Sequence, residues 1–233
     1  MSATAASSLG VAPTTPSASP GRAGASTRLR HAVLIASPVL AGLFVLIGVA
    51  TDPGAGVSGP AMWKLYAEHP DPLQWSAYDL HWSYTFWALP AMGAFAFLRR
   101  RGAWLANIAG LFGIIGISTL PGILVVDFYD SAVAGVAGVD TLGKVYEAFD
   151  GMWAVTAMMM PGNIALMLCL PLAVAAFWRG GLVRWWALPV ILVGIAGLWF
   201  SGFVWWGGAI MLAAGIGLAV EFALGLRRTA VAV

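Results

Sequence analysis

The sequence predicts an all-α membrane protein with six transmembrane helices arranged as three hairpins. Hydrophobic residues make up 60% of its 233 residues and charged residues only 9%, whereas roughly 25% of an ordinary soluble domain is charged. So few charges cannot cover a surface that faces water, and the chain also contains apolar runs long enough to be membrane spans. Because each backbone amide in lipid must be hydrogen-bonded within its own segment, these runs are expected to be helices.

The apolar runs define a transmembrane domain over residues 31–226. Each run is long enough, or nearly so, to cross about 30 Å of hydrocarbon as a helix. The last two runs are joined only by Ser201-Gly202, which predicts a tight helical hairpin. The predicted spans are about 32–50, 80–98, 103–126, 152–177, 183–200 and 203–225.

The two ends of the chain are predicted to be tails. Residues 1–30 are rich in Ser, Ala, Thr, Pro and Gly, a composition typical of a disordered segment. The run 32–50 follows arginines in the manner of a signal peptide, but its length of about 20 residues fits an uncleaved first span better. Residues 227–233 form a short C-terminal tail.

The positions of the arginines set the predicted orientation. All of them fall before the first span, between the second and third, between the fourth and fifth, or after the sixth: Arg22, Arg28, Arg30, Arg99, Arg100, Arg101, Arg179, Arg184, Arg227 and Arg228. The loops 51–79 and 127–151 are acidic instead. The positive-inside rule then places both termini in the cytoplasm and the acidic loops outside. The predicted location is a bacterial-type plasma membrane.

The chain repeats a pattern of four residues with the same spacing. Residues 78–90 read YDLHWSYTFWALP and residues 149–161 read FDGMWAVTAMMMP, so both contain D-x-x-W-x-x-T-x-x-x-x-P. A K-[LV]-Y element precedes each copy, at residues 64–66 and 144–146. The first four spans are therefore predicted to be two copies of one unit that cross the membrane in the same direction, a parallel internal repeat.

Helix structure alone explains the repeated pattern. The Asp is expected to cap a helix N-terminus, the Trp to lie at headgroup depth, the Thr to bond to the backbone one turn earlier and the Pro to kink the helix. A ligand site made from the two Asp residues is the alternative. The pairs, in order, are Asp79 and Asp150, Trp82 and Trp153, Thr85 and Thr156, and Pro90 and Pro161.

The acidic residues of the outer loops are the main candidates for binding a ligand or a cation. Asp127 and Asp130 share a helix face at a spacing of three if the third span continues that far. Two acids at the negative end of a helix are electrostatically unfavourable, which favours a cationic partner. The predicted outer vestibule consists of Asp79, His81, Asp127, Asp130, Glu147 and Asp150.

Two polar residues lie inside predicted spans. Asn163 follows Pro161-Gly162 in the middle of the fourth span, where a broken helix can line a cavity. An interhelical hydrogen bond is the alternative interpretation. Glu221 lies about one turn inside the end of the sixth span and is predicted to reach Arg227 or Arg228.

The sequence predicts neither a metal site nor a cofactor. His31 and His81 are expected at opposite membrane faces, too far apart to ligate one haem, and His69 lies in an outer loop. No spacing typical of zinc ligands is present. Cys169 is the only cysteine, which leaves no redox pair and no thiolate cluster.

Three functional hypotheses remain from the sequence. The first is a small transporter-like or ligand-binding membrane protein with an acidic outer vestibule. The second is a structural or partner-binding subunit that uses Gly-rich helix faces, such as Gly110, Gly113 and Gly116, to contact a second copy or a membrane partner. The third is an enzyme that uses the outer carboxylates, which is less expected because common catalytic motifs are absent. The lipid bilayer is the predicted partner, and a net charge of +2 gives no reason to expect nucleic acid.

Overall fold

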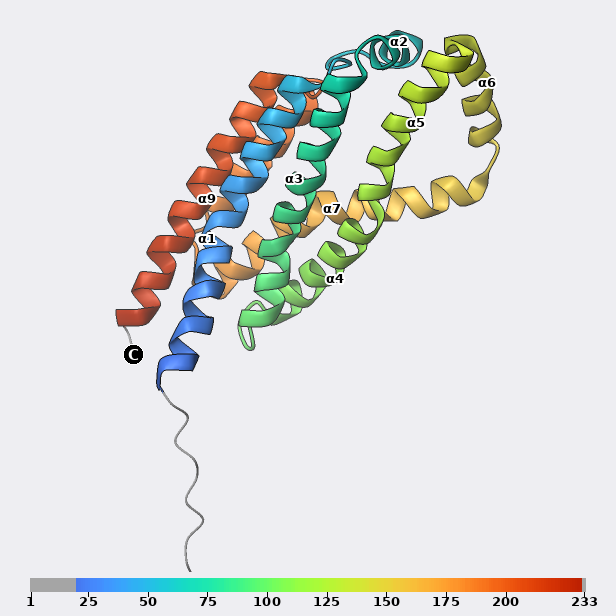
Figure 1. Ribbon diagram of the computed structural model, residues 1–233. Coiled ribbons are helices and arrows are strands. Elements are labelled where there is room, and N and C mark those ends of the chain that lie inside the picture. Colours follow the sequence, from blue (N-terminus) through green and yellow to red (C-terminus); the bar gives the residue numbers. More distant parts are fainter. Residues whose placement is uncertain (1–19, 232–233) are drawn as a thin grey trace, which may run out of the picture.

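The computed structural model describes the backbone of residues 20–231 and the side chains of residues 24–120 and 122–228. Between residues 20 and 231 the regular structure is entirely helical (Figure 1). The helices are α1 (Pro20–Thr51), α2 (Pro60–Glu68), α3 (Pro70–Phe97), α4 (Ala103–Thr119), α5 (Pro121–Ala137), α6 (Val139–Asp150), α7 (Trp153–Arg179), α8 (Ala187–Phe200) and α9 (Trp205–Val231).

Four segments of the described chain are long and apolar enough to cross a membrane. They are Gly24–Thr51 in α1, Ala103–Ala137 across α4 and α5, Trp153–Arg179 in α7 and Trp205–Arg228 in α9. The chain is therefore an all-helical protein with several apolar helices compatible with a membrane. The segment Ala103–Ala137 has 35 residues, or about 52 Å of helix, which exceeds a hydrocarbon core of about 30 Å. Part of it must lie outside this core or run obliquely.

The other two predicted spans correspond to helices of a different kind. α8 is apolar but has only 14 residues, about 21 Å of helix. α3 has 28 residues, but its first half carries polar side chains such as Asp71, Gln74 and Asp79. These two helices account for the difference between six predicted spans and four apolar candidates.

The helices form one bundle in which α3 contacts α1 on one side and α4, α5 and α7 on the other. α1 packs along α9 on one side and α3 on the other, and α4 packs along α7 (Figure 1). α8 pairs with α9 as a hairpin. α2 lies across one end of the bundle, where it contacts α5 and α6 (Figure 1).

Glycines bring several of these helices into close contact. Gly42 of α1 lies against the backbone of Leu212 in α9, and Gly215 of α9 lies against the backbone of Pro38 in α1. In α4, Gly110 faces Phe95 and Gly116 faces the backbone of Leu166. This Gly-rich face of α4, which also includes the buried Gly113, is therefore filled by α3 and α7 of the same chain.

Two helices begin earlier than the sequence predicts. α1 begins at Pro20, inside the segment 1–30 predicted as a disordered tail, while residues 1–19 of that segment lie outside the described residues. α3 begins at Pro70 rather than near residue 80. Proline is favoured at the first helical position because its fixed φ suits the helix and it lacks the N–H that would go unbonded there.

The prediction that Asp79 and Asp150 are N-caps is wrong for both residues. Asp79 lies in the interior of α3, more than two turns after its start. Asp150 is the last residue of α6, and Met152 is the residue that precedes α7. The two copies of the repeated pattern therefore occupy different local structures, because Pro70 moves the start of α3 upstream while a separate helix ends at Asp150.

Candidate functional site

A group of carboxylates and tyrosines lies under α2, where α5 and α6 approach it. Asp127 and Asp130 come from α5, Tyr66 from α2, Tyr146 from α6 and Asp52 from the segment after α1. Tyr66 is buried, and its backbone carbonyl accepts a hydrogen bond of 2.8 Å from the Ser131 hydroxyl of α5. We call Asp52, Asp127 and Asp130 the acidic cluster.

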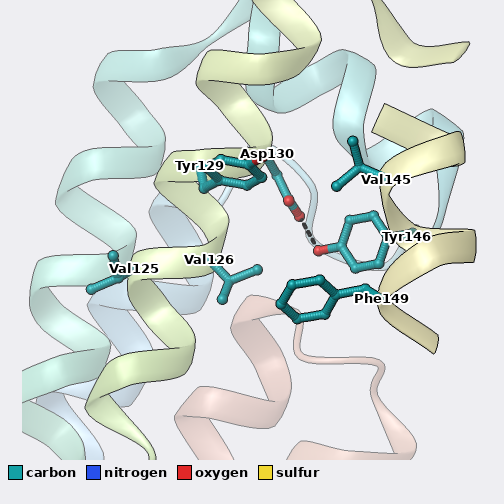
Figure 2. Close-up of a pocket in the computed structure, with 7 residues that line it drawn as sticks. All are labelled: Val125, Val126, Tyr129, Asp130, Val145, Tyr146 and Phe149. Carbon is teal, nitrogen blue, oxygen red and sulfur yellow. Dashed lines mark hydrogen bonds between the residues drawn. The ribbon is translucent and has the colours of Figure 1, made fainter. Parts of the chain in front are cut away.

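Asp130 is the most deeply buried member of the acidic cluster. Only 1% of its surface is exposed. The Tyr146 hydroxyl donates a hydrogen bond of 2.6 Å to Asp130 Oδ2 (Figure 2). Asp130 Oδ1 is buried and has no hydrogen-bond partner. Buried polar atoms are satisfied in the great majority of cases, so this oxygen requires an explanation.

Tyr146 is held in place to donate this bond. Its ring stacks on Trp63 of α2, with 4.9 Å between the ring centroids and an interplanar angle of 12°. Burial raises the pKa of Tyr146 well above its ordinary value, and the hydrogen bond to Asp130 raises it further. Tyr146 therefore stays protonated and acts as a donor.

The three carboxylates influence one another electrostatically. Asp127 is half-buried and lies within electrostatic reach of both Asp130 and Asp52. The ion pairs formed by described side chains are Lys64–Glu68 and Arg184–Glu221, and neither includes the cluster. Three acids share this region without a basic side chain to compensate them.

Asp52 also belongs to the acidic cluster, although no sequence motif marks it as a site residue. It follows α1 in a Asp-Pro-Gly turn, and its Oδ1 accepts a hydrogen bond of 2.8 Å from the Gly54 amide. Burial raises the pKa of Asp52, while the bonds from Gly54 and the Tyr66 hydroxyl oppose this change. Tyr66 brings Asp52 under α2, a tertiary contact that residue spacing does not indicate.

An apolar cavity of about 290 Å³ lies between α5 and α6 beside Asp130. Figure 2 shows its walls, with Asp130 and Tyr146 between the two helices. The lining residues are Val125, Val126, Tyr129, Asp130, Val145, Tyr146 and Phe149.

A second, more enclosed cavity of about 120 Å³ lies within the bundle. Its lining includes Ser83, Tyr84 and Asn163. The Ser83 hydroxyl is buried without a hydrogen-bond partner, and Tyr84 lies within electrostatic reach of Asp127. Asn163 lines this cavity from α7, which continues through Pro161 and is not broken there as one interpretation from the sequence expects.

The other residues predicted for the vestibule do not join the acidic cluster. Asp79 is buried within α3, and no other charged side chain affects its carboxylate electrostatically. His81 is exposed on α3 next to Trp82. Glu147 and Asp150 are exposed on α6, although Asp150 lies within electrostatic reach of Tyr146.

The residues predicted as structural anchors have different surroundings in the two copies of the pattern. Trp82 is 37% exposed and Trp153 is 81% exposed. The Thr85 hydroxyl donates to the His81 carbonyl one turn earlier, at 3.3 Å, whereas Thr156 is exposed. Pro90 and Pro161 both lie inside helices, α3 and α7 respectively.

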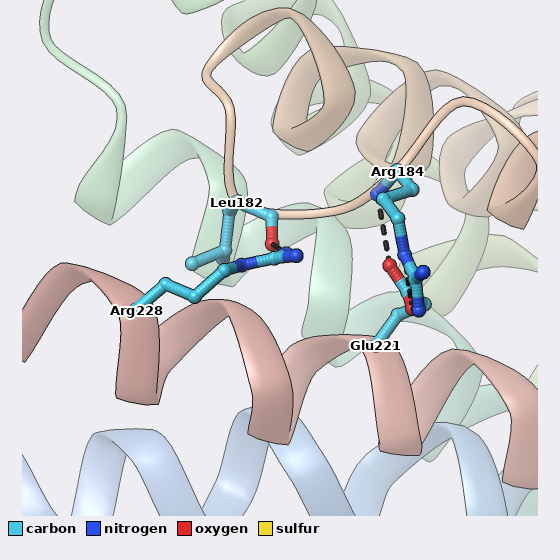
Figure 3. A network of polar contacts seen from close by, with 4 residues as sticks. All are labelled: Leu182, Arg184, Glu221 and Arg228. Atoms are coloured by element: carbon cyan, nitrogen blue, oxygen red, sulfur yellow. Dashed lines mark hydrogen bonds and ion pairs between the residues drawn. The ribbon is translucent and has the colours of Figure 1, made fainter.

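Glu221 is paired with a residue other than those predicted. It is fully buried, and its carboxylate accepts hydrogen bonds from the Arg184 backbone amide at 2.9 Å, from Nε at 3.0 Å and from Nη2 at 2.5 Å (Figure 3). Arg228 instead donates to the Leu182 carbonyl at 3.2 Å. The prediction of Arg227 or Arg228 as partner is wrong because the segment between α7 and α8 folds back onto α9. Glu221 therefore has a structural role, since it anchors this segment.

Among the described residues, no group of three or more His, Cys, Asp or Glu side chains is arranged to hold a metal ion. No protein-family model, curated protein or solved structure matches the chain. The part of the chain that the structure describes is all-helical, with four candidate membrane-spanning segments and a buried acidic cluster at one end.

Proposed function

We propose that this chain is a multi-pass membrane protein that binds a cationic ligand at the acidic cluster and works as a small transporter-like or ligand-binding protein. The main observation behind this proposal is that the buried Oδ1 of Asp130 has no hydrogen-bond partner. Burying a carboxylate without a compensating cation or hydrogen bonds costs stability. A buried polar atom without a partner calls for an explanation such as a bound ion, and ionisable groups in such surroundings cluster at functional sites.

The second cavity favours transport over binding alone. It contains the unpartnered Ser83 hydroxyl and Asn163, so it offers polar groups deeper in the bundle. Tyr84 lines this cavity and interacts electrostatically with Asp127. A ligand or proton that leaves the acidic cluster would meet these polar side chains in an otherwise apolar cavity.

The proposed topology has six spans, with α3 and α8 as the two crossings beyond the four apolar candidates. Both termini are cytoplasmic, because all arginines then lie on the inner side. α2, α6 and the acidic cluster are outside or at the outer interface. In this arrangement the first four spans form two related out-and-back units, each with a short outer helix.

Thiol labelling tests this topology. In a Cys169→Ala background, a membrane-impermeant maleimide is expected to label Ser58→Cys in intact cells, because this exposed residue lies in the loop after α1. Arg100→Cys, an exposed residue between α3 and α4, is expected to react only after the cells are permeabilised, because α3 crosses the membrane in the six-span topology. Labelling of both residues from the same side would contradict the six-span topology.

Cation-dependent stability tests the binding proposal. The purified protein is heated in sodium, potassium, calcium and organic ammonium chlorides, and its melting temperature is compared with that of an Asp127→Asn/Asp130→Asn variant. At least one cation is expected to stabilise the wild type, because a ligand that binds only the folded state at 100 times its Kd adds about 2.7 kcal/mol. The variant should lose this effect.

The control is Asp71→Asn/Asp140→Asn, which removes two exposed acids outside the cluster. It should keep the wild-type response to the cation. Equal stabilisation of all three proteins by every salt would show that the effect is not due to the cluster, and the proposal would fail.

A partner-binding role is the alternative with a specific observation behind it. The first turns of α7 expose apolar side chains, among them Trp153 at 81% and Met158 at 72%. Val136 at the end of α5 is 92% exposed. Contact with lipid also explains such exposed apolar residues in a membrane protein.

A further inference from the structure

We infer that the ligand is a hydrophobic organic ammonium ion, held between α5 and α6 with Asp130 as its counter-ion. This inference rests on the proposed function and names the class of cation that the site takes. It joins two observations: an apolar cavity of about 290 Å³, and Asp130 among its lining residues, whose buried carboxylate has an oxygen without a hydrogen-bond partner.

The walls of the cavity suit the carbon groups of such an ion. Val125, Val126 and Val145 supply aliphatic surface. The remaining walls include aromatic rings from Tyr129, Tyr146 and Phe149 (Figure 2). Aromatic faces attract a cation electrostatically, and cages of this kind are the usual recognition device for alkylated ammonium groups.

The same walls are a poor match for an inorganic cation. Calcium requires about six to eight oxygen ligands, whereas the surface of this cavity is apolar and Asp130 is the one charged residue among those that line it. An alkylated ammonium ion needs no full shell of oxygens, because carbon groups surround its positive charge. The composition of the walls therefore favours an organic cation.

A neutral lipid chain would fit the apolar walls but not Asp130. It would leave the buried Asp130 carboxylate without a compensating positive charge. An alkylated ammonium group would compensate the negative charge of the Asp130 carboxylate while Tyr146 continues to donate to Oδ2. The stacking of Tyr146 on Trp63 holds that arrangement in place before the ligand arrives.

The route to the cavity lies along the exposed side of α5 and α6. Val125 is 60% exposed, Tyr129 52% and Phe149 42%, so three of the lining residues are partly accessible from outside the bundle. In a membrane protein this side faces lipid or the headgroup region. A hydrophobic cation that partitions into the membrane could then enter laterally.

The test compares two probes of nearly the same shape. Benzyltrimethylammonium carries the charge, and neopentylbenzene replaces its nitrogen by carbon. Binding of each to the full-length protein in lipid nanodiscs is measured by equilibrium dialysis at constant ionic strength. The ammonium probe is expected to bind at least tenfold more tightly than the neutral probe, and Asp130→Asn is expected to remove this preference.

Two further variants keep the test decisive if Asp130→Asn does not fold. Phe149→Leu keeps an apolar wall but removes an aromatic face, so it should weaken binding of the ammonium probe more than that of the neutral one. Asp140→Asn, at an exposed position of α6, should behave as the wild type.

The outcomes separate this inference from the proposed function. Equal binding of the two probes to the wild type would overturn the inference and identify the cavity as a site for neutral apolar molecules. If an inorganic cation still stabilised the wild type and not the Asp127→Asn/Asp130→Asn variant, the proposed function would survive without the organic ligand. If neither kind of cation bound, both would fail.

Discussion

Gly215→Ala is expected to push α1 and α9 apart and to destabilise the folded protein. A Cβ atom at position 215 would collide with the Pro38 carbonyl, with the carbonyl carbon at 2.9 Å. These are backbone atoms, so they cannot move aside as a side chain can. Overpacking of this kind typically costs about 1–3 kcal/mol, and the expected result is a lower melting temperature in detergent.

Gly217→Ala is the matched control on the same helix. A Cβ there would make only an ordinary contact of 3.6 Å with Val190 Cγ1. Because alanine favours a helix by about 0.8–1.0 kcal/mol over glycine, this change should be neutral or stabilising. Equal melting temperatures for the two variants would contradict the close packing of α1 on α9.

The double variant Asp130→Leu/Tyr146→Phe is expected to be more stable than the wild type while it loses cation binding. It removes the unpartnered Oδ1 and both partners of the Asp130–Tyr146 hydrogen bond. Leaving a buried polar group unsatisfied costs about 1–3 kcal/mol, whereas replacing both partners by apolar groups of similar shape can be neutral or stabilising. Thermal unfolding of the ligand-free proteins measures the difference.

Tyr146→Phe alone separates the two residues. It removes the hydrogen bond that Asp130 Oδ2 accepts and retains the ring that stacks on Trp63, so it should be less stable than the double variant. If the double variant were much less stable than the wild type, Asp130 would be a structural residue and not a site kept for function.

The sequence predicts the helical membrane architecture because composition and run length report it directly. Four of the predicted spans correspond to apolar candidate helices, since each keeps a long stretch without charges. α3 and α8 were also predicted to be spans. They are not among the apolar candidates, because α3 is polar in its first half and α8 is short. Local signals also gave a wrong result for Asp79, because a proline further upstream sets the start of its helix.

The candidate site was only partly accessible to prediction. Asp127 and Asp130 were identified together because a spacing of three residues places them on one helix face. Asp52, Tyr66 and Tyr146 join them through tertiary packing of α2 and α6, which residue spacing does not encode. The Arg184–Glu221 pair was missed for the same reason, since the two residues are far apart in the chain.

Reaction with a hydrophobic carbodiimide tests the claim that Asp130 receives a cation most directly. Such reagents enter apolar sites and modify carboxyl groups there, and peptide mass spectrometry identifies the residue. The account predicts that Asp130 is labelled in membranes and that a cation which stabilises the protein slows this labelling, while labelling of the exposed Asp140 is unchanged. An Asp130 that is never labelled, or whose labelling rate is the same with and without every cation tested, would contradict the account.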